Sequence, residues 1–302
     1  MIQYLYLGRV PYDEALRLQE ELIALRQQGR IGNVLLLLEH PPVLTLGRNA
    51  KRANVLASDE LLAQRGVTLH EINRGGDVTY HGPGQLIGYP IFDLRSLRHP
   101  SSGRLGPVDF VRLMEEALIR LCGVYGVAAG CIRGLTGVWC HLRWGGPLDG
   151  QCASTANQNQ ARPEAKIAAI GIHVSRGVTS HGFAFNVTTD LRDFLLINPC
   201  GITDRQVTSL EREVEQPARL PGLEAIAHQA ARQFGLVFGE QVLALEGLAA
   251  LRALAENQPA NVSQPPAATD SPPPQFPAQD TPLQVPRQVE RLHNARDRPV
   301  NV

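Results

Sequence analysis

The chain has 302 residues, 43% of them hydrophobic, and its 29 basic side chains balance its 29 acidic ones. A formal net charge of zero argues against a nucleic acid or an anionic membrane as a partner. The longest apolar run, residues 34–38, is too short to span a bilayer, and the N-terminal residues lack the pattern of a signal peptide. The five cysteines include no CxxC pair, which argues against a disulfide framework and a zinc site. We therefore predict a cytoplasmic protein with reduced thiols and no bound metal.

In chain order, the first predicted element is an amphipathic helix over residues 11–30, with acidic side chains near its start and arginines near its end. Short apolar runs then predict four strands, over residues 33–39, 42–46, 67–74 and 86–94. A second amphipathic helix follows over residues 107–125. Three more strands are predicted over residues 138–141, 165–174 and 182–187, and two helices over residues 223–234 and 241–255.

Strands gather in the middle of the chain and helices lie outside them. This order favours an α+β domain, an α/β sandwich-like arrangement with a mixed β-sheet covered by helices, over a regular βαβ series. We assign residues 1–256 to a single domain, in which the polar residues 141–165 form an exposed loop. Residues 257–302 are rich in proline and poor in large apolar side chains, so they are predicted to be a disordered tail.

The segment RGGDVTYHGPGQLIGYP, residues 74–90, is rich in glycine and raises the question of what it could hold. It is not a P-loop, because Gly84 is followed by Gln85 and Leu86 instead of a lysine and a hydroxyl residue. It is not a dinucleotide fingerprint, because its glycines have the wrong spacing and a strand pattern follows them. Two interpretations stay open: a glycine-rich strand pair that lies against a flat or chain-like ligand, and a tight hairpin without a ligand.

The cysteines differ in their surroundings. Cys122, Cys131 and Cys140 lie in apolar segments and are predicted to be small buried hydrophobes, whereas Cys152 lies in the polar loop without an activating neighbour. Cys200 stands between Pro199 and Gly201, in a turn that can present its thiol outward.

A nucleophilic thiol needs an activating group, because only a few per cent of an ordinary thiol is ionised at pH 7. The candidates are His81, His173, His181 and Lys166. Lys166 opens the apolar strand KIAAIGIHV and is either a surface lysine at a strand end or a partner of Cys200. At about 4 Å and an effective dielectric constant near 20, that pair would gain ~4 kcal/mol, which lowers the pKa of the thiol by at most about three. A Cys–His pair with His81 or His181 stays open.

Three motifs in register, RGGDVTYHGPGQLIGYPI, KIAAIGIHVSRGVTSHGFAFNV and INPCGI, resemble the lipoyl(octanoyl) transferases of the LipB type. The likeness covers most of residues 1–215. It implies the biotin/lipoate protein ligase fold, with helices on one side of the sheet. It implies transfer of an octanoyl or lipoyl group from octanoyl-acyl carrier protein to a lysine of the lipoyl domains of 2-oxoacid dehydrogenase E2 subunits and of the glycine cleavage H protein. It implies no cofactor.

The resemblance also assigns roles to residues. Cys200 corresponds to the catalytic nucleophile and Lys166 to its activating lysine. The acyl-binding residues it implies are Arg74, Gly75, Gly76, Asp77, Val78, Thr79, Tyr80, His81, Ala169, Ile170, Gly171, Gly182, Phe183 and Ala184. The sequence departs from the family pattern at Asp77, where the family often has glutamine, and in residues 141–165 and the proline-rich tail.

The chemistry that these residues predict has two steps. The Cys200 thiolate attacks the octanoyl thioester, and the acceptor lysine then attacks the acyl-enzyme to form an amide. Lys166 first stabilises the thiolate; after acylation removes that negative charge, burial lowers the pKa of Lys166 and lets it accept the proton of the acceptor amine. The rival functions are an ATP-dependent lipoate or biotin ligase, a non-catalytic module that binds carrier protein, and a Cys–His thioesterase.

Overall fold

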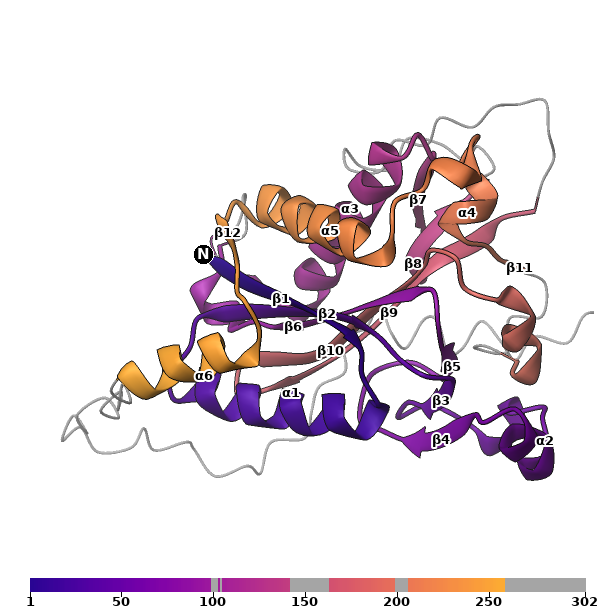
Figure 1. Ribbon diagram of the computed structural model, residues 1–302, viewed down its shortest axis with the longest axis horizontal. Helices are drawn as coiled ribbons and strands as arrows, with labels where there is room; N and C mark the ends of the chain where they lie inside the picture. Colours follow the sequence, from indigo (N-terminus) through magenta and orange to yellow (C-terminus); the bar gives the residue numbers. More distant parts are fainter. Residues whose placement is uncertain (99–102, 104, 142–162, 199–205, 259–302) are drawn as a thin grey trace, which may run out of the picture. The chain divides into compact units, whose positions relative to one another are not determined.

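The computed structural model describes residues 1–98, 103, 105–141, 163–198 and 206–258 (Figure 1). By its internal contacts the chain divides into two units, residues 1–262 and 263–302, and every described residue belongs to the first. The predicted disorder of the tail, beyond Gln258, therefore lies outside the described residues, as does most of the predicted loop 141–165.

Within the described residues, nine strands form one mixed sheet at the centre of the first unit. Their order is β12 (Val242–Ala244), β1 (Ile2–Arg9), β2 (Asn33–Glu39), β6 (Gln85–Ile91), β10 (Val178–Asn186), β9 (Ala165–Ser175), β8 (Leu135–Cys140) and β7 (Ala129–Ile132), with β11 (Gln206–Val207) paired to β9. Strand β1 runs parallel to β12 and β2, and β11 runs parallel to β9. The neighbouring strands from β2 to β7 pair antiparallel, which confirms the predicted mixed sheet.

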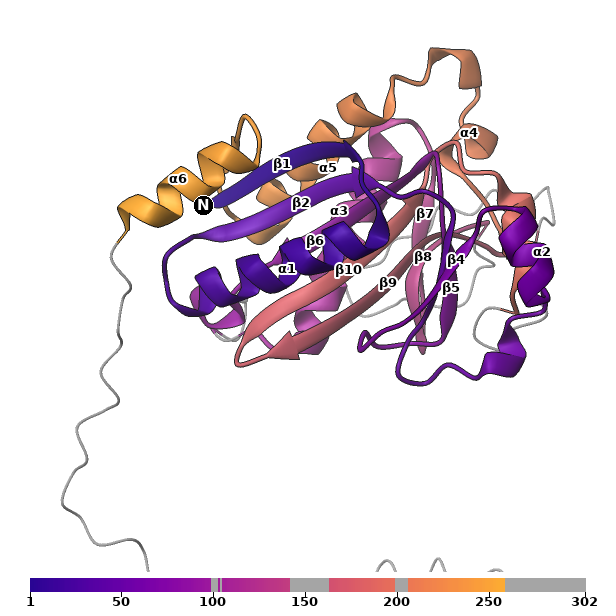
Figure 2. The same cartoon turned by 60° about the horizontal axis from the view of Figure 1, so that its bottom comes forward.

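Helices cover both faces of this sheet (Figures 1 and 2). Helices α3 (Pro107–Val124) and α5 (Leu223–Phe238) pack on one face, and α1 (Tyr12–Gln27) and α6 (Leu248–Asn257) pack on the other. Strand β2 explains why both faces need a cover: Leu35 and Leu37 join the first core, and Leu36 and Leu38 join the second. The α+β class is confirmed, but the implied one-sided cover is corrected, since an exposed face of this apolar strand would cost hydrophobic burial.

A second sheet of three strands lies beside the first. It consists of β4 (Thr68–Glu71), β3 (Val43–Leu46) and β5 (Val78–His81), in that order. Its core also takes in side chains from α2 (Asp59–Gln64) and from the 3-10 helix Leu191–Leu196. Two short helical elements, α4 (Leu210–Glu213) and the 3-10 helix Arg52–Asn54, lie in connecting segments.

The glycine-rich segment 74–90 contains β5 and β6, and these strands belong to different sheets. They are not paired with each other, so neither the predicted strand pair nor the predicted tight hairpin is right. The turn between them needs Gly84, whose φ is +78° and whose position would place an added Cβ 2.6 Å from Thr188 Oγ1. The glycines move the chain from one sheet to the other.

Most of the predicted elements are present with small shifts at their ends, and two corrections stand out. The predicted helix 241–255 is wrong over its first part, where β12 pairs with β1 and Gly247 turns the chain at a φ of +95° before α6 begins. Strand β1 was not predicted at all. No helix of the described residues is long and apolar enough to cross a membrane.

Candidate functional site

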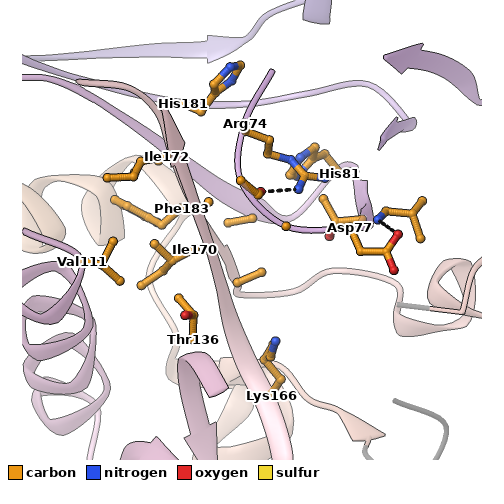
Figure 3. Close-up of a pocket in the computed structure, with 18 of the residues that line it drawn as sticks. Arg74, Asp77, His81, Val111, Thr136, Lys166, Ile170, Ile172, His181 and Phe183 are labelled. Atoms are coloured by element: carbon orange, nitrogen blue, oxygen red, sulfur yellow. Dashed lines mark hydrogen bonds between the residues drawn. The ribbon is translucent and has the colours of Figure 1, made fainter. Parts of the chain in front are cut away.

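A cavity of about 710 Å³ lies where the segment before and within β5 faces strands β9 and β10 (Figure 3). Residues from α1, α3 and β8 also line it, as do residues on both sides of the segment 199–205. The cavity therefore draws its walls from parts of the chain that are far apart in sequence.

Glycine residues let the loop on one wall of the cavity approach the strand on the other wall closely. The amide of Gly75 donates to the carbonyl of Ile172 on β9 at 3.1 Å, which fixes the loop of residues 74–77 across that strand. A Cβ at Gly171 would lie 2.8 Å from the carbonyl oxygen of Gly75, so a larger residue there would push the loop away. Gly171 pairs with Gly182 on β10, which makes this stretch of the sheet unusually low in side-chain bulk.

The cavity has an apolar side and a polar side. The labelled apolar side chains Val111, Ile170, Ile172 and Phe183 gather together, and Arg74, His81 and Asp77 lie apart from them (Figure 3). An apolar ligand chain could therefore lie along β9, where the apolar side chains would shield it from water.

Arg74 and Asp77 hold the polar side in place. Arg74 is 9% exposed, and its guanidinium donates to the carbonyl and hydroxyl oxygens of Thr45, both at 2.9 Å, and to the carbonyl of Gly75 at 3.0 Å. Asp77 accepts from the backbone N–H of Val78 at 2.7 Å and from the side-chain amide of Asn54 at 2.6 Å. A carboxylate at this position thus accepts two hydrogen bonds, and one of them ties the segment around Asn54 to the cavity wall.

Three buried histidines near the polar side are neutral. Burial is the main cause that lowers the pKa of His81 to about 3 and the pKa of His40 and His181 to about 4. The nearby charge of Arg74 further lowers the pKa of His81 and of His181. His81 Nδ1 lies 2.8 Å from Gln85 Oε1, and His181 Nε2 lies 2.7 Å from Asn73 Oδ1. Imidazoles with so low a pKa are weak bases, which disfavours them as activators of a thiol.

These histidines make stability depend on pH. Between pH 6.5 and about 4, the unfolded chain binds a proton at each of His40, His81 and His181, whereas the folded chain does not. The contribution of these histidines to the free energy of unfolding is therefore fully present above pH 6.5 and is lost as the pH falls. Each histidine accounts for a loss of about 1.4 kcal/mol per pH unit. We expect urea unfolding to show a loss of about 2 kcal/mol per histidine from pH 7 to pH 5, and His40→Asn to reduce that loss. Equal stability at the two pH values would contradict this assignment.

Lys166 lies on β9 and borders the cavity (Figure 3). Its Nζ is 4.6 Å from the centroid of the Trp139 ring on β8, a cation–π contact that favours the charged amine. On its other side Val207 of β11 pairs with it, and the amide of Thr208 donates to the Lys166 carbonyl at 2.9 Å. The lysine backbone is thus held between two strands.

A buried carboxylate shapes the strand beside this lysine. Glu115 of α3 is fully buried and accepts from the amide of Gly137 at 2.8 Å and from Arg112 at 2.6 Å. Gly137 has a φ of +119°, and a Cβ there would lie 2.5 Å from the Ala168 carbonyl and 3.4 Å from Lys166 Cε. The register of β8 against β9 shifts just beyond it. Glu115 therefore stabilises the irregular backbone that leaves room for the Lys166 side chain.

The predicted acyl-binding residues are brought together, with one exception. Tyr80 points away into the core of the second sheet, where its hydroxyl donates to Asp193 Oδ2 at 2.6 Å. The predicted residues that line the cavity are Arg74, Gly75, Gly76, Asp77, Val78, Thr79, His81, Ala169, Ile170, Gly171, Gly182, Phe183 and Ala184. His181 lines it too, whereas His173 is not among the lining residues.

The cysteines are placed only in part. Cys200 and Cys152 lie outside the described residues. Cys122 and Cys140 are buried as predicted, whereas Cys131 is only partly buried and its thiol lies 3.5 Å from Glu115 Oε2. Burial raises the pKa of the thiol of Cys122 well above its ordinary value and that of Cys140 to about 12, so both are unreactive.

Several lining residues were missed by sequence reasoning. All but Tyr89 and Ile172 come from segments outside the three motifs, and they are Tyr12, Ile72, Tyr89, Val111, Gly134, Leu135, Thr136, Trp139, Ile172, Phe194, Gln206 and Val207. Only the position of Ile172, two residues after Ile170 on one strand face, carried a usable signal in the sequence.

Solved structures with similar architecture define the class of this fold. A lipoate-protein ligase A solved with ATP superposes with a TM-score of 0.56 at 17% identity, over 85% of this chain and 93% of that one. A bipartite lipoate protein ligase from Thermoplasma acidophilum, described with its E2 lipoyl domain, gives a TM-score of 0.54 at 17% identity, over 85% and 91% of the two chains. The fold is that of the lipoate protein ligases, as the sequence motifs implied.

Sequence comparison identifies the family of this chain among the proteins that share the fold. The family described as the lipoyl protein ligase A/B catalytic domain matches residues 11–234. The octanoyltransferase of Acidobacterium capsulatum is 60% identical over 82% of this chain and 94% of its own length, and that of Koribacter versatilis is 52% identical over 87% and 95%. The chain belongs to the octanoyltransferases of the lipoyl protein ligase A/B family. It is an acyltransferase that acts in protein lipoylation.

Proposed function

We propose that this acyltransferase moves an octanoyl or lipoyl group from acyl carrier protein to a specific lysine of a lipoyl domain, through a thioester on Cys200. The observation that carries the proposal is a cavity with an apolar side along β9 and Lys166 at its edge (Figure 3). The proposed catalytic residues are Cys200 and Lys166, and the proposed acyl-binding residues are the cavity-lining ones that the motifs predicted.

The dimensions of the cavity suit an acyl chain. Lys166, Ile170 and Ile172 share one face of β9, and six residues of strand span about 20 Å. Seven C–C bonds of about 1.5 Å make an octanoyl chain at most about 11 Å long. The chain therefore fits between Lys166 and the far end of the apolar side, with its carbonyl carbon toward the lysine.

The described residues on both sides of Cys200 support its role. Phe194, before it, and Gln206 and Val207, after it, line the cavity. Gln206 pairs with Ala165, the residue before Lys166. The described residues therefore border the cavity before and after the segment that contains Cys200, and after it they lie beside the lysine.

In the first step, the Cys200 thiolate sulfur bonds to the octanoyl carbonyl carbon, and the carrier's sulfur leaves with the sulfur–carbon electron pair and takes up a proton from water. The Lys166 ammonium, held over Trp139, stabilises the attacking thiolate by its charge. The three neutral histidines could not do so, because their low pKa leaves them uncharged near pH 7.

In the second step, the acceptor's amine nitrogen bonds to the same carbonyl carbon and the Cys200 thiolate leaves. An ordinary lysine amine is neutral in only about one molecule in 2,500 at pH 7, so the step needs a base. Acylation has removed the negative charge beside Lys166, so this amine gives up its proton more readily and can take the proton of the acceptor, directly or through a water molecule.

Partners and location extend this proposal. The T. acidophilum ligase is described with an E2 lipoyl domain, which supports a lipoyl domain as the acceptor here. We propose the lipoyl domains of 2-oxoacid dehydrogenase E2 subunits and the glycine cleavage H protein as the particular acceptors. We propose residues 1–256 as one catalytic domain; α6 ends at Asn257. A cytoplasmic location stays a prediction.

Intact-mass measurement after mixing with octanoyl-acyl carrier protein tests the proposal. We expect one octanoyl adduct on the unmodified chain and on the control Cys131→Ser, and none on Cys200→Ser, since serine is a far weaker nucleophile without a strong base.

Rival functions give other results in the same experiment. The absence of an adduct would favour a binding module, and release of free octanoate without an acceptor would favour a thioesterase. Turnover of free octanoate with ATP that survives Cys200→Ser would favour a ligase.

A further inference from the structure

Glu115 is a fully buried carboxylate beside the candidate site, and the proposed reaction gives it no part. It lies on α3, and its side chain is completely withdrawn from solvent. A carboxylate in a protein interior is costly unless hydrogen bonds and a counter-charge replace the lost hydration. An apolar side chain of similar size would avoid this cost, so this carboxylate needs a specific reason.

Three donors from three elements converge on this carboxylate. Glu115 Oε1 accepts from the amide of Gly137 on β8 at 2.8 Å. Its Oε2 accepts from the guanidinium of Arg112 on α3 at 2.6 Å and from the thiol of Cys131 on β7 at 3.5 Å. A carboxylate offers two acceptor oxygens, whereas a carboxamide would turn an N–H group towards one of these donors. The three donors therefore explain why the residue is a glutamate.

The strands are irregular where they meet Glu115. The register of β7 against β8 shifts in the interval that contains Cys131. The register of β8 against β9 shifts between Val138 and Trp139, just after Gly137. Gly137 itself has a φ of +119°, which residues with a side chain rarely adopt. The carboxylate therefore bonds to the stretch in which β8 leaves regular pairing with both of its neighbours.

The shift between β8 and β9 puts Lys166 opposite Trp139. Val138 pairs with Ala168 and Trp139 pairs with Lys166, so β9 carries one residue more than β8 in this interval. Without the shift, Trp139 would pair with Ile167, and Lys166 would point to the other face of the sheet. Residues directly opposite each other share a face, and Lys166 Nζ lies 4.6 Å from the centroid of the Trp139 ring. The irregularity therefore decides that the lysine lies over the tryptophan.

We propose that Glu115 is a positioning residue for the acyl transfer: by holding the Gly137 amide, it keeps the shifted register that places the Lys166 ammonium over Trp139. The role of Lys166 in this inference rests on the proposed function, and the inference adds a residue outside the three sequence motifs that sets the position of this amine. Glu115 is not among the residues that line the cavity, so it acts through the strand. If the carboxylate only fastened α3 to the sheet, its replacement would not move Lys166.

The experiment reads the position of Lys166 directly. The chain contains two lysines, Lys51 and Lys166, so reductive methylation with ¹³C-formaldehyde puts NMR-visible methyl groups on these amines and on the N-terminus. Methylation keeps the charge of the amine, and a methylated ammonium still binds an aromatic face. The ring of Trp139 displaces the methyl signal of Lys166 upfield. Lys51 is the internal reference, and Lys166→Arg assigns the signals by removing one of them.

Two double variants differ in whether the Gly137 amide keeps its acceptor. Both carry Arg112→Met; one also carries Glu115→Gln and the other Glu115→Leu. Both are expected to fold, because replacement of a buried ion pair by uncharged groups is often neutral. The glutamine oxygen can accept from Gly137 once the arginine no longer competes for it, so the Lys166 signal should stay upfield. In the leucine variant this signal should lose most of its displacement.

Met114→Ala is the control for general loosening of α3. Met114 is fully buried on the same helix, and its truncation removes core packing without removing the acceptor of Gly137, so the Lys166 signal should not move. The double variants are then compared in the two half-reactions. We expect the leucine variant to slow both acylation and transfer by at least about tenfold, and the glutamine variant by less than about twofold.

Three results would overturn the proposal: an unmoved Lys166 signal in the leucine variant, an equal movement in both double variants, or an equal movement in Met114→Ala. Should the double variants fail to fold, Glu115→Gln alone replaces the leucine variant, because Gly137 and Arg112 then compete for one oxygen. An unmoved signal there would equally overturn the proposal. If the signals move as expected but no donor acylates the unmodified chain, the positioning of Lys166 stands and it is the proposed function that fails.

Discussion

Replacing Lys166 with arginine is expected to slow transfer to the acceptor by at least about 100-fold while acylation of Cys200 falls less than tenfold. Arginine keeps the positive charge that stabilises the thiolate, and its planar cation can still lie over Trp139. It cannot act as a base at neutral pH, because its pKa is above 12. The two half-reactions separate because only the second needs a proton acceptor.

Rapid mixing followed by intact-mass analysis measures both steps. The first is followed as the octanoyl adduct forms, and the second as the adduct is lost after a lipoyl domain is added. Lys166→Met, which lacks both charge and base, serves as the comparison and should be slow in both steps. A Lys166→Arg variant that loses the two steps equally would show that the lysine has no separate role as base.

Replacing Gly182 with alanine is expected to destabilise the fold by about 3 kcal/mol or more. A Cβ at this position would lie 2.0 Å from the carbonyl oxygen of Gly88 and 2.6 Å from Pro90 Cδ. Both neighbours belong to β6, the strand next to β10 at the centre of the main sheet, so neither can move without separating the two strands. The cost is that of overpacking a tightly packed interior.

Gly123→Ala is the matched control. Gly123 lies in α3 and a Cβ there would meet no atom within 4 Å. Alanine in a helix is favoured over glycine by about 1 kcal/mol, so this variant should be as stable as the unmodified chain or slightly more so. Urea unfolding of the two variants measures the change in the free energy of unfolding. A change below about 0.5 kcal/mol for Gly182→Ala would show that β6 and β10 can accommodate the added methyl group.

How far the sequence predicted the fold depended on how local each signal was. Residues 33–39 form β2 with the predicted bounds, because an unbroken apolar run bounded by polar residues is typical of a strand buried on both faces. Residues 242–244 form a strand although helical spacing runs through them, because pairing with β1 is a long-range contact that the local pattern does not contain.

The candidate site divides in the same way. The loop from Arg74 to Asp77 and the facing stretch of β9 were predicted, because resemblance to known motifs assigned them. Trp139 and Val111 were not, since each reaches the cavity only through the packing of β8 and α3 against β9. Tyr80 lies inside a motif and yet points elsewhere, because alternate residues of a strand point to opposite faces.

The stretch that holds the predicted nucleophile connects two different sheets. It departs from Asn198, whose neighbour Ile197 bridges to Val55 beside the second sheet, and it ends at Gln206 in β11 of the main sheet. Because these two anchors belong to different sheets, any shift of one sheet against the other would change the distance between the two ends of this stretch.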